Sequence, residues 1–270
     1  MNILQRVILF KKIYFLCDLK KINTMGNNLK RIAMWASPRC LSTVLLRSWA
    51  SRPDTFVHDE PLYPHYLLVS GRNDPGRDEV LNHYETDWVK IVEQVTTGTI
   101  PAGKSIYYQK YMVYRLQPHI DINWVFKLTN CFLIRKPKEM LLSYIQLWQK
   151  NPTLETIGIL RLKQLFESVR KHTGIIPPVI DAQDLLENPR HILSLLCKAV
   201  GVEFTDAMLK WHTGNPTDDI WSKYGWYENA RNSTGFYHYK PKENSIPKQF
   251  ESILFQCNEV YDELYKYRLK

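Results

Sequence analysis

Apolar runs and stretches of helical periodicity alternate along the chain beyond residue 30. The apolar runs, rich in β-branched and aromatic residues, predict strands at residues 31–36, 55–60, 105–112, 129–135 and 177–182. Apolar positions that repeat with a helical period predict helices at residues 41–51, 61–70, 78–97, 136–149, 155–174, 188–201 and 247–268. This alternation predicts an α/β fold with a mostly parallel central sheet flanked by helices, in a single domain over residues 31–270.

Glycine, proline and polar residues mark the ends of several predicted elements. Pro137 suits the first turn of a helix, and Gly174 and Gly201 suit helix ends. The segment SGRNDPGR at residues 70–77 predicts a mobile turn. Aromatic residues mix with Gly, Asn and Pro from residue 211 onward, which predicts a long loop before the last helix.

The first predicted strand leads through a tight polar turn, SPRCLST at residues 37–43, into a helix. In a parallel sheet this turn lies at the carboxyl edge, where ligands bind, and backbone N–H groups at a helix start attract anions. Ser42 and Thr43 add hydroxyl donors, and Arg39 can contact two oxygens of one anion. The turn therefore suits a phosphate group, although a well-capped helix would use the same residues. The glycines and lysine of the NTPase phosphate loop are missing.

A second candidate anion site begins where the predicted strand 129–135 ends. Arg135 closes the apolar run, and Ser143 follows eight residues later on the next predicted helix. Eight residues make a little over two helical turns, so Ser143 can face the same side as the helix start. We expect Arg135 and Ser143 to hold a second phosphate together.

The basic charge is concentrated at the start of the chain. The formal net charge is +9, but residues 1–30 contain six Lys and Arg against one Asp, so residues 31–270 carry only +4. A mildly basic body favours a small polyanion, and no zinc-finger spacing, RNP-like motif or long basic stripe is present, so nucleic acid is not an expected partner.

We interpret residues 1–30 as a basic extension outside the fold, either a targeting peptide or a segment ahead of a translation start at Met25. Its apolar part is too short and too interrupted by charges for stable membrane insertion.

The five cysteines are odd in number, scattered and never in a C-x-x-C spacing. This pattern favours reduced thiols in the cytoplasm, without a disulfide framework or a zinc site. Cys40 lies in the polar turn, where nearby amides would lower its pKa, unless it is simply a small filler residue.

Together these motifs resemble the sulfotransferases that use 3′-phosphoadenosine 5′-phosphosulfate. In that family, a strand–loop–helix with Lys or Arg before Ser or Thr holds the 5′-phosphosulfate, and an Arg-x-Pro-x₅-Ser segment holds the 3′-phosphate. Residues 37–43 are similar to the first motif and residues 135–143 to the second, while residues 179–202 are similar to a strand, acidic turn and Asn-Pro helix of the family. The resemblance implies a P-loop-like sulfotransferase fold of the bacterial, small-molecule type. The donor-binding residues that it implies are Arg39, Cys40, Leu41, Ser42, Thr43, Arg135 and Ser143.

The chain departs from the family at the proton acceptor. Many cytosolic members carry a catalytic His in a Lys-x-His segment, but residues 110–112 here are Lys-Tyr-Met. Lys110 would still contact the bridging or sulfonate oxygen. The family's other solution is a Glu near the end of the second strand, so the resemblance implies Glu60 as the general base. Competing candidates for this role are His58, Asp59 and His65.

The resemblance also implies a late loop that folds over the nucleotide. Ser233, Thr234 and Gly235 suit this loop, and an aromatic ring would stack on the adenine. Candidates for the ring are Trp221, Tyr224 and Trp226. No metal is expected, because Arg39 and Lys110 would neutralise the charge that develops during transfer.

The sequence thus predicts a sulfotransferase that moves a sulfuryl group from 3′-phosphoadenosine 5′-phosphosulfate to a hydroxyl of a small-molecule acceptor. The alternatives are a catalytically inactive nucleotide-binding protein of the same fold and a P-loop kinase or NTPase. A nucleic-acid binder would depend on the basic residues 1–30. No pattern in the sequence identifies the acceptor or an oligomeric state.

Overall fold

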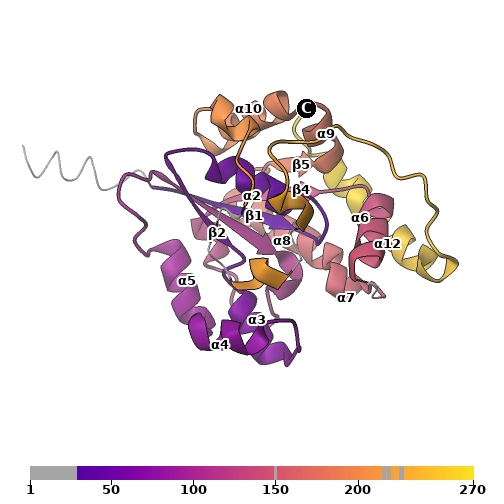
Figure 1. Cartoon of the computed structure of the whole chain (residues 1–270), viewed down its shortest axis with the longest axis horizontal. Helices are drawn as coiled ribbons and strands as arrows, with labels where there is room; N and C mark the ends of the chain where they lie inside the picture. Colours follow the sequence, from indigo (N-terminus) through magenta and orange to yellow (C-terminus); the bar gives the residue numbers. More distant parts are fainter. Residues whose placement is uncertain (1–28, 149–150, 215–216, 218–219, 225–227) are drawn as a thin grey trace, which may run out of the picture. The chain divides into compact units, whose positions relative to one another are not determined.

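The structure is a computed structural model, which describes residues 29–148, 151–214, 217, 220–224 and 228–270. The chain divides into two compact units, Met1–Lys30 and Arg31–Lys270, and the fold described here is that of the second unit. Within this unit, helices flank a central sheet (Figure 1).

Five parallel strands form the sheet within the described part of the chain. They lie in the order β2-β3-β1-β4-β5, and their bounds are Lys30–Ala36 for β1, Thr55–Asp59 for β2, Ile106–Met112 for β3, Thr129–Ile134 for β4 and Val179–Asp181 for β5. The five apolar runs of the sequence become these strands, so the predicted mostly parallel α/β fold is confirmed. Because the strands are parallel, the segments that follow β1, β2, β3 and β4 meet at one edge of the sheet.

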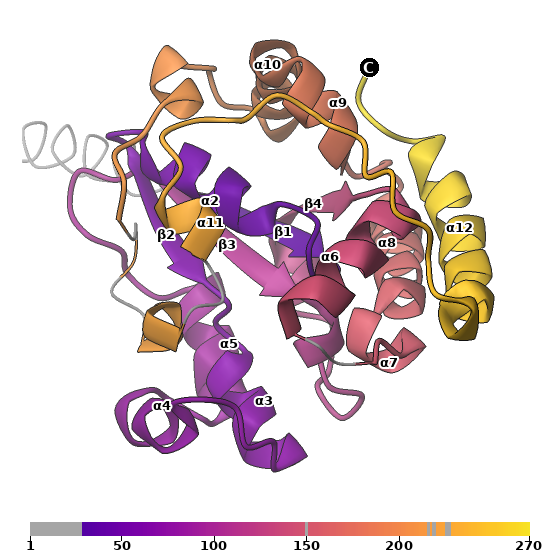
Figure 2. The same cartoon turned by 45° about the vertical axis from the view of Figure 1, so that its right-hand side comes forward.

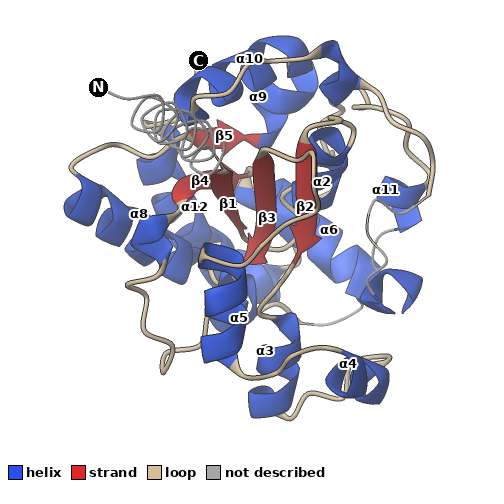
Figure 3. Cartoon of the chain, turned by 90° about the vertical axis from the view of Figure 1, so that its left-hand side faces the viewer, coloured by secondary structure: helices blue, strands red, loops and turns tan. Residues whose placement is uncertain are grey.

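The helices pack around this sheet (Figures 2 and 3). Helix α2 packs against β2 and β3, whereas α8 and α12 pack against β4. Their bounds are Ser42–Ala50 for α2, Tyr63–Ser70 for α3, Arg77–His83 for α4, Trp88–Thr96 for α5, Pro137–Trp148 for α6, Leu154–Ile157 for α7, Ile159–Thr173 for α8, Ala182–Glu187 for α9, Pro189–Val200 for α10, Glu228–Arg231 for α11 and Glu251–Tyr265 for α12.

The core is centred on β1, whose residues from Ile32 to Ala36 are all fully buried. The Trp35 indole stacks on the Tyr111 ring of β3, with ring centroids 4.4 Å apart. Its N–H donates to Asn130 Oδ1 of β4 at 2.8 Å, so the one buried polar atom of this side chain is satisfied. These contacts join the three central strands and fix the edge from which the polar turn after β1 emerges.

Two helices predicted as continuous are each broken in the structure. The predicted helix 78–97 is two helices, α4 and α5, and Asp87 begins the second by accepting from Val89 N–H. The predicted helix 155–174 is likewise split into α7 and α8 at Gly158, which has a φ of 70°. A Cβ at Gly158 would lie 2.9 Å from the Val113 side chain, so a contact with a distant segment requires glycine there. The last helix, predicted from residue 247, begins at Glu251 after a 3₁₀ turn.

Candidate active site

The turn between β1 and α2 has an unusual backbone at the carboxyl edge of the sheet. Within the described residues, the non-glycine residues with positive φ are Arg39 (65°), Leu41 (69°) and Glu60 (52°). Each such conformation costs about 1–3 kcal/mol and persists only where the surroundings enforce it, and such residues cluster at functional sites. The residue that begins α2, Leu41, provides no side-chain cap, and the first turn of α2 has no acidic residue. The first N–H groups of α2 therefore remain available to an anion from outside the helix.

A cavity of about 560 Å³ lies beside this turn and is called the basic cavity below. The sequence predicts seven of its lining residues as donor-binding: Arg39, Leu41, Ser42, Thr43, Arg135, Ser143 and Ser233. Its other lining residues are Val44, Gln146, Leu147, Glu228, Asn229, Ala230, Tyr237 and Lys242. The two predicted anion sites, about a hundred residues apart in the sequence, thus share one cavity.

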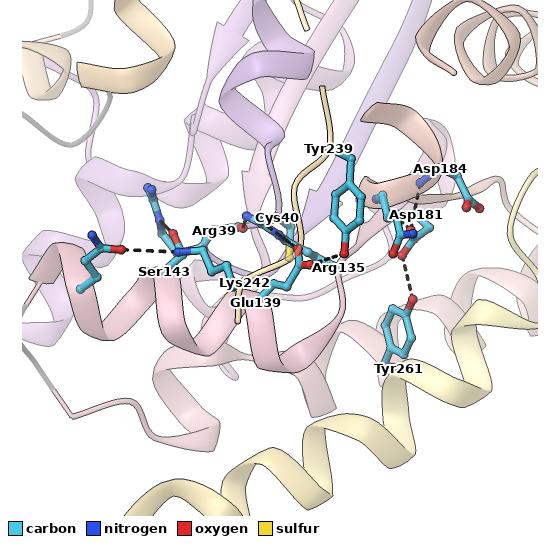
Figure 4. A network of polar contacts seen from close by, with 12 residues as sticks. Arg39, Cys40, Arg135, Glu139, Ser143, Asp181, Asp184, Tyr239, Lys242 and Tyr261 are labelled. Carbon is cyan, nitrogen blue, oxygen red and sulfur yellow. Dashed lines mark hydrogen bonds and ion pairs between the residues drawn. The ribbon is translucent and has the colours of Figure 1, made fainter. Parts of the chain in front are cut away.

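Direct hydrogen bonds join the two predicted anion sites (Figure 4). Arg39 Nε donates to Ser143 Oγ at 3.0 Å, and Arg135 Nη1 donates to the backbone oxygen of Arg39 at 2.9 Å. Arg135 also contacts Glu139 Oε2, one turn further along α6, at 3.2 Å. The second motif therefore holds the backbone of the first in its left-handed conformation, and both arginines remain at the cavity wall.

A third cation of the basic cavity, Lys242, belongs to none of the predicted motifs. Its ammonium lies 3.4 Å from Gln146 Oε1 of α6. Partial burial, together with the charges of Arg135 and Arg39, lowers the pKa of Lys242 below its usual range. Lys242 lies in the extended segment between α11 and α12, beyond the predicted late-loop residues Ser233, Thr234 and Gly235 (Figure 2). Its role is visible only once the chain has folded.

The same segment is tied to α6 by a tyrosine. Tyr239 Oη donates to Glu139 Oε1 at 2.5 Å, while the other oxygen of Glu139 pairs with Arg135. Burial and the bond to Glu139 raise the pKa of Tyr239, which keeps the phenol protonated as the donor. Glu139 thus connects the late segment to Arg135, which lies between β4 and α6 (Figure 4).

Of the three predicted late-loop residues, one lines the basic cavity and two do not. Ser233 lines the basic cavity, but its hydroxyl donates to Ala230 O at 2.6 Å and accepts from Trp211 Nε1 at 3.0 Å. Thr234 and Gly235 are not among the lining residues; the Thr234 carbonyl accepts from Trp211 N–H, and Gly235 forms an antiparallel bridge with Lys210. Their backbone contacts hold the loop in place. The candidate adenine-stacking residues Trp221 and Tyr224 are also absent from the cavity lining, and Trp226 lies outside the described residues.

Cys40 does not have the lowered pKa that its place in the turn suggested. Its side chain is buried, with Sγ 3.7 Å from Pro38 O. Burial raises the pKa of the thiol to about 12, which outweighs the opposing effect of Arg135. The interpretation as a filler residue is therefore the one that the structure supports.

Four charged side chains form a buried cluster next to Thr43, called the buried charge cluster below: Asp59, Glu60, Lys110 and Arg115. The Lys110 ammonium lies 2.7 Å from Asp59 Oδ1 and 2.9 Å from Glu60 Oε1, and the other oxygen of Glu60 pairs with Arg115. Two cations and two carboxylates balance to zero, as burial of charge requires. Lys110 Nζ is also 3.3 Å from Thr43 Oγ1, and Thr43 lines the basic cavity.

The backbone and an aromatic ring fix the position of Glu60. Glu60 N–H donates to the Lys110 carbonyl at 2.9 Å, and Tyr63 N–H donates to the Glu60 carbonyl at 2.9 Å. The Arg115 guanidinium lies 3.7 Å from the centroid of the Tyr63 ring, a cation–π contact. Sequence analysis missed Arg115, because a lone arginine after a strand belongs to no recognisable pattern.

The other candidates for the general base have different partners. His58 Nδ1 is 2.7 Å from Tyr107 Oη, and burial lowers the pKa of His58 to about 4. Asp59 pairs with Lys110, and His65 contacts His119 and the backbone of Thr86. Of the predicted proton acceptors, Glu60 and Asp59 are therefore the ones that lie in the buried charge cluster.

No group of three or more His, Cys, Asp or Glu side chains in the described ranges is arranged to hold a metal ion. No helix in the same ranges is long and apolar enough to cross a bilayer.

Two plant proteins are similar in sequence to most of the chain. Two Arabidopsis thaliana proteins named branched-chain-amino-acid aminotransferase-like protein 2 and protein 1 are 31% and 32% identical to the chain over 234 residues. The match covers 86% of this chain but only 41% of those proteins, so the chain spans less than half of their length.

Three solved structures are similar to 89% of the chain. They are the sulfotransferase domain of the Synechococcus PCC 7002 olefin synthase (13% identity, TM-score 0.46, 96% of that chain), the sulfotransferase domain of the curacin biosynthetic pathway (15%, 0.48, 99%) and a sulfotransferase from Alicyclobacillus acidocaldarius (10%, 0.49, 97%). A family model described as a sulfotransferase domain matches residues 30–262. Because this match covers the sheet, the basic cavity and the buried charge cluster, the protein belongs to the sulfotransferase-domain family.

Proposed function

We propose that the protein transfers a sulfuryl group from 3′-phosphoadenosine 5′-phosphosulfate to a hydroxyl of a small-molecule acceptor. The observation that carries the proposal is the convergence of both phosphate motifs on one cavity, joined by the Arg39–Ser143 hydrogen bond. Three cations line this cavity, and the bare N-terminus of α2 adds N–H donors. A donor with phosphate groups at two separate positions suits such an arrangement.

Each end of the donor has its own set of residues. The 5′-phosphosulfate would lie on the turn after β1, with the N–H groups of residues 40–43 and the hydroxyls of Ser42 and Thr43 as donors. The 3′-phosphate would lie between Arg135 and Ser143. Arg39 spans the two positions, since its side chain contacts Ser143 and its carbonyl contacts Arg135. We assign Lys242 to the donor as well, because it lines the same cavity.

The transfer step would use the buried charge cluster. The acceptor oxygen attacks sulfur as its proton passes to Glu60, and the S–O bond to the 5′-phosphate breaks with its electron pair on the leaving nucleotide. Lys110 would neutralise the charge that develops on the leaving oxygen. The Lys110 ammonium contacts the hydroxyl of Thr43, and Thr43 lines the cavity.

This arrangement also links donor binding to the strength of the base. Lys110 is held by Asp59 and Glu60. A bound phosphosulfate would draw the ammonium toward Thr43, and Glu60 would lose this cationic partner. Loss of a neighbouring cation raises the pKa of a carboxyl group. Glu60 would therefore become a better proton acceptor when the donor is in place.

Four buried cysteines without a disulfide, Cys40, Cys131, Cys197 and Cys257, support the proposal of a reducing, cytoplasmic environment. The small-molecule acceptor would approach from the Thr43 side of the basic cavity, since Lys110 contacts both Thr43 and Glu60.

Titration calorimetry with 3′-phosphoadenosine 5′-phosphate tests the donor site. Wild-type protein should bind with a micromolar dissociation constant, and Arg39→Ala and Arg135→Ala should each weaken binding by about 10- to 100-fold, as expected for loss of a charged hydrogen bond. The matched control is Arg190→Ala, which removes an exposed arginine paired with Asp206. Binding that is absent, or equal in all four proteins, would exclude this donor site.

Turnover with the radiolabelled donor and a panel of alcohols separates an enzyme from an inactive nucleotide-binding protein. Transfer of label that is lost in Glu60→Gln, with nucleotide affinity retained, supports the proposal. Tight nucleotide binding without transfer to any acceptor, including water, supports the inactive alternative. Preferential binding of ATP would favour the kinase or NTPase.

A further inference from the structure

Two histidines from different segments of the chain, neither of them a proposed catalytic residue, face each other. His65 on α3 and His119 in the turn after β3 approach through their Nε2 atoms, 2.9 Å apart. Their ring centroids are 5.1 Å apart, and the ring planes are tilted by 58°. We propose that this pair is a binding site for a divalent transition-metal ion of the Cu²⁺ or Ni²⁺ type.

The environment of His65 is that of a metal-binding histidine. Its side chain is buried at 5% exposure, and Nδ1 lies 2.8 Å from the carbonyl oxygen of Thr86. An acceptor at this distance places the ring proton on Nδ1 and the lone pair on Nε2, the nitrogen that lies 2.9 Å from His119 Nε2. Metal-binding histidines usually donate their second ring N–H in this way, which fixes the tautomer and the ring orientation.

His119 is held in place by its turn and is open to solvent. Pro118 precedes it, and Ile120 N–H closes the turn on Gln117 O at 3.1 Å. Ile120 is buried, so the turn is anchored to the core, while His119 itself is exposed. An ion can therefore reach the pair from solvent without a rearrangement of the backbone.

The spacing of the two nitrogen atoms indicates the kind of ion. With metal–imidazole bonds of about 2.0–2.1 Å, nitrogen atoms 2.9 Å apart subtend an angle of about 90° at the metal. This is the angle between neighbouring ligands in square-planar or octahedral coordination, which Cu²⁺ and Ni²⁺ prefer, and smaller than the tetrahedral angle of zinc. No further His, Cys, Asp or Glu of the described chain completes a group of three, so water would fill the other positions. We therefore expect micromolar affinity, with Cu²⁺ bound more tightly than Ni²⁺ or Zn²⁺.

A bound ion would tie together the two segments that position Arg115. Helix α3 carries Tyr63, whose ring lies against the Arg115 guanidinium, and the turn with His119 begins two residues after Arg115. The site would therefore stabilise the surroundings of Glu60 without contacting the donor cavity. This role is independent of whether the proposed transfer reaction is correct.

The test is calorimetry of the untagged full-length chain with NiCl₂ and CuCl₂ in a non-chelating buffer. One ion should bind per chain in wild type and in His191→Ala, an exposed histidine on α10 that serves as the control. Affinity should fall at least tenfold in His119→Ala, which alters an exposed side chain and should fold normally. His65→Ala should have the same effect if it folds. At about a 100-fold excess of free ion over the dissociation constant, the melting temperature of wild type should rise by about 5 °C, and that of His119→Ala should not change.

Electron paramagnetic resonance of the Cu²⁺ complex provides a second readout. Coupling to two imidazole nitrogens in wild type, reduced to one in His119→Ala, would support the site. No binding, or the same affinity and spectrum in wild type and His119→Ala, would overturn it and leave the pair as a hydrogen bond between neutral rings.

Discussion

The basic cavity and the buried charge cluster lie side by side at the carboxyl edge of the sheet, and they differ in how their charges are balanced. Arg39, Arg135 and Lys242 bring three cations to the cavity lining, which also contains one carboxylate, that of Glu228; Arg135 pairs in addition with Glu139. In the buried cluster, two cations and two carboxylates neutralise each other away from solvent. The described lining of the cavity thus carries a net positive charge that attracts an anionic ligand, whereas the charges of the cluster cancel each other. Thr43 connects the two regions.

The largest effect is expected from Glu60→Gln, which removes one charge from the buried charge cluster at nearly constant volume. Turnover should fall by about 10²- to 10⁴-fold through loss of the proton acceptor. The free energy of unfolding should fall by about 3 kcal/mol, because two buried cations then share one carboxylate. Affinity for 3′-phosphoadenosine 5′-phosphate, which lacks the sulfuryl group, should change little, since Glu60 does not line the cavity.

Urea unfolding, calorimetry and turnover measure these three quantities. Glu79→Gln is the control, because Glu79 makes comparable contacts with Lys223 and Tyr224 on an exposed surface. A Glu60→Gln protein with turnover within threefold of wild type would remove Glu60 from the mechanism.

A double-mutant cycle on Lys110 and Asp59 sharpens the claim of charge balance. Lys110→Met alone should destabilise the protein, because it leaves an unpaired carboxylate in the cluster. Adding Asp59→Asn restores neutrality, so the double variant should be more stable than the sum of the single effects by about 1–3 kcal/mol. Turnover should stay low in the double variant, since the cation at the leaving oxygen is still missing. Strictly additive effects on the free energy of unfolding would contradict the cluster as a coupled unit.

In the basic cavity, Lys242→Met should weaken nucleotide binding about tenfold, the effect of one lost charged contact. The lowered pKa of Lys242 gives this contact a pH dependence. Binding of an anion favours the protonated lysine, so affinity should fall as pH rises toward and through that pKa. The fall between pH 7.5 and pH 9.5 should be smaller in Lys242→Met, and calorimetry at the two pH values measures it. Lys163→Met, which removes a half-buried lysine paired with Glu263, should keep the wild-type profile.

The smallest effect is expected at Cys40. Because burial raises the pKa of its thiol to about 12, iodoacetamide at pH 8 should leave Cys40 unmodified in the folded protein. Peptide mass spectrometry before and after unfolding in urea measures the difference. Rapid modification of Cys40 in the native state would contradict the buried conformation of the turn.

The same contrast explains what the sequence could predict. Arg39 and Ser143 were predictable because each lies in a local pattern of strand end, turn and helix start. Such a local pattern can be recognised in the sequence alone. Lys242 and Arg115 were not, because neither belongs to a predicted motif and each reaches its site only through the fold of the chain. Gly158 shows the same limit in the fold, since the helical period runs through it and only a contact with Val113 and Tyr114 requires the break.

The most direct test of the central claim is a cycle of two ligands and two proteins at the basic cavity. Calorimetry would compare 3′-phosphoadenosine 5′-phosphate with adenosine 5′-phosphate, on wild type and on Arg135→Ala. We predict that wild type loses about 10- to 100-fold in affinity when the 3′-phosphate is removed, and that Arg135→Ala binds both nucleotides about equally weakly. The same discrimination between the two nucleotides in both proteins would show that Arg135 does not hold the 3′-phosphate and would contradict the assignment of the cavity.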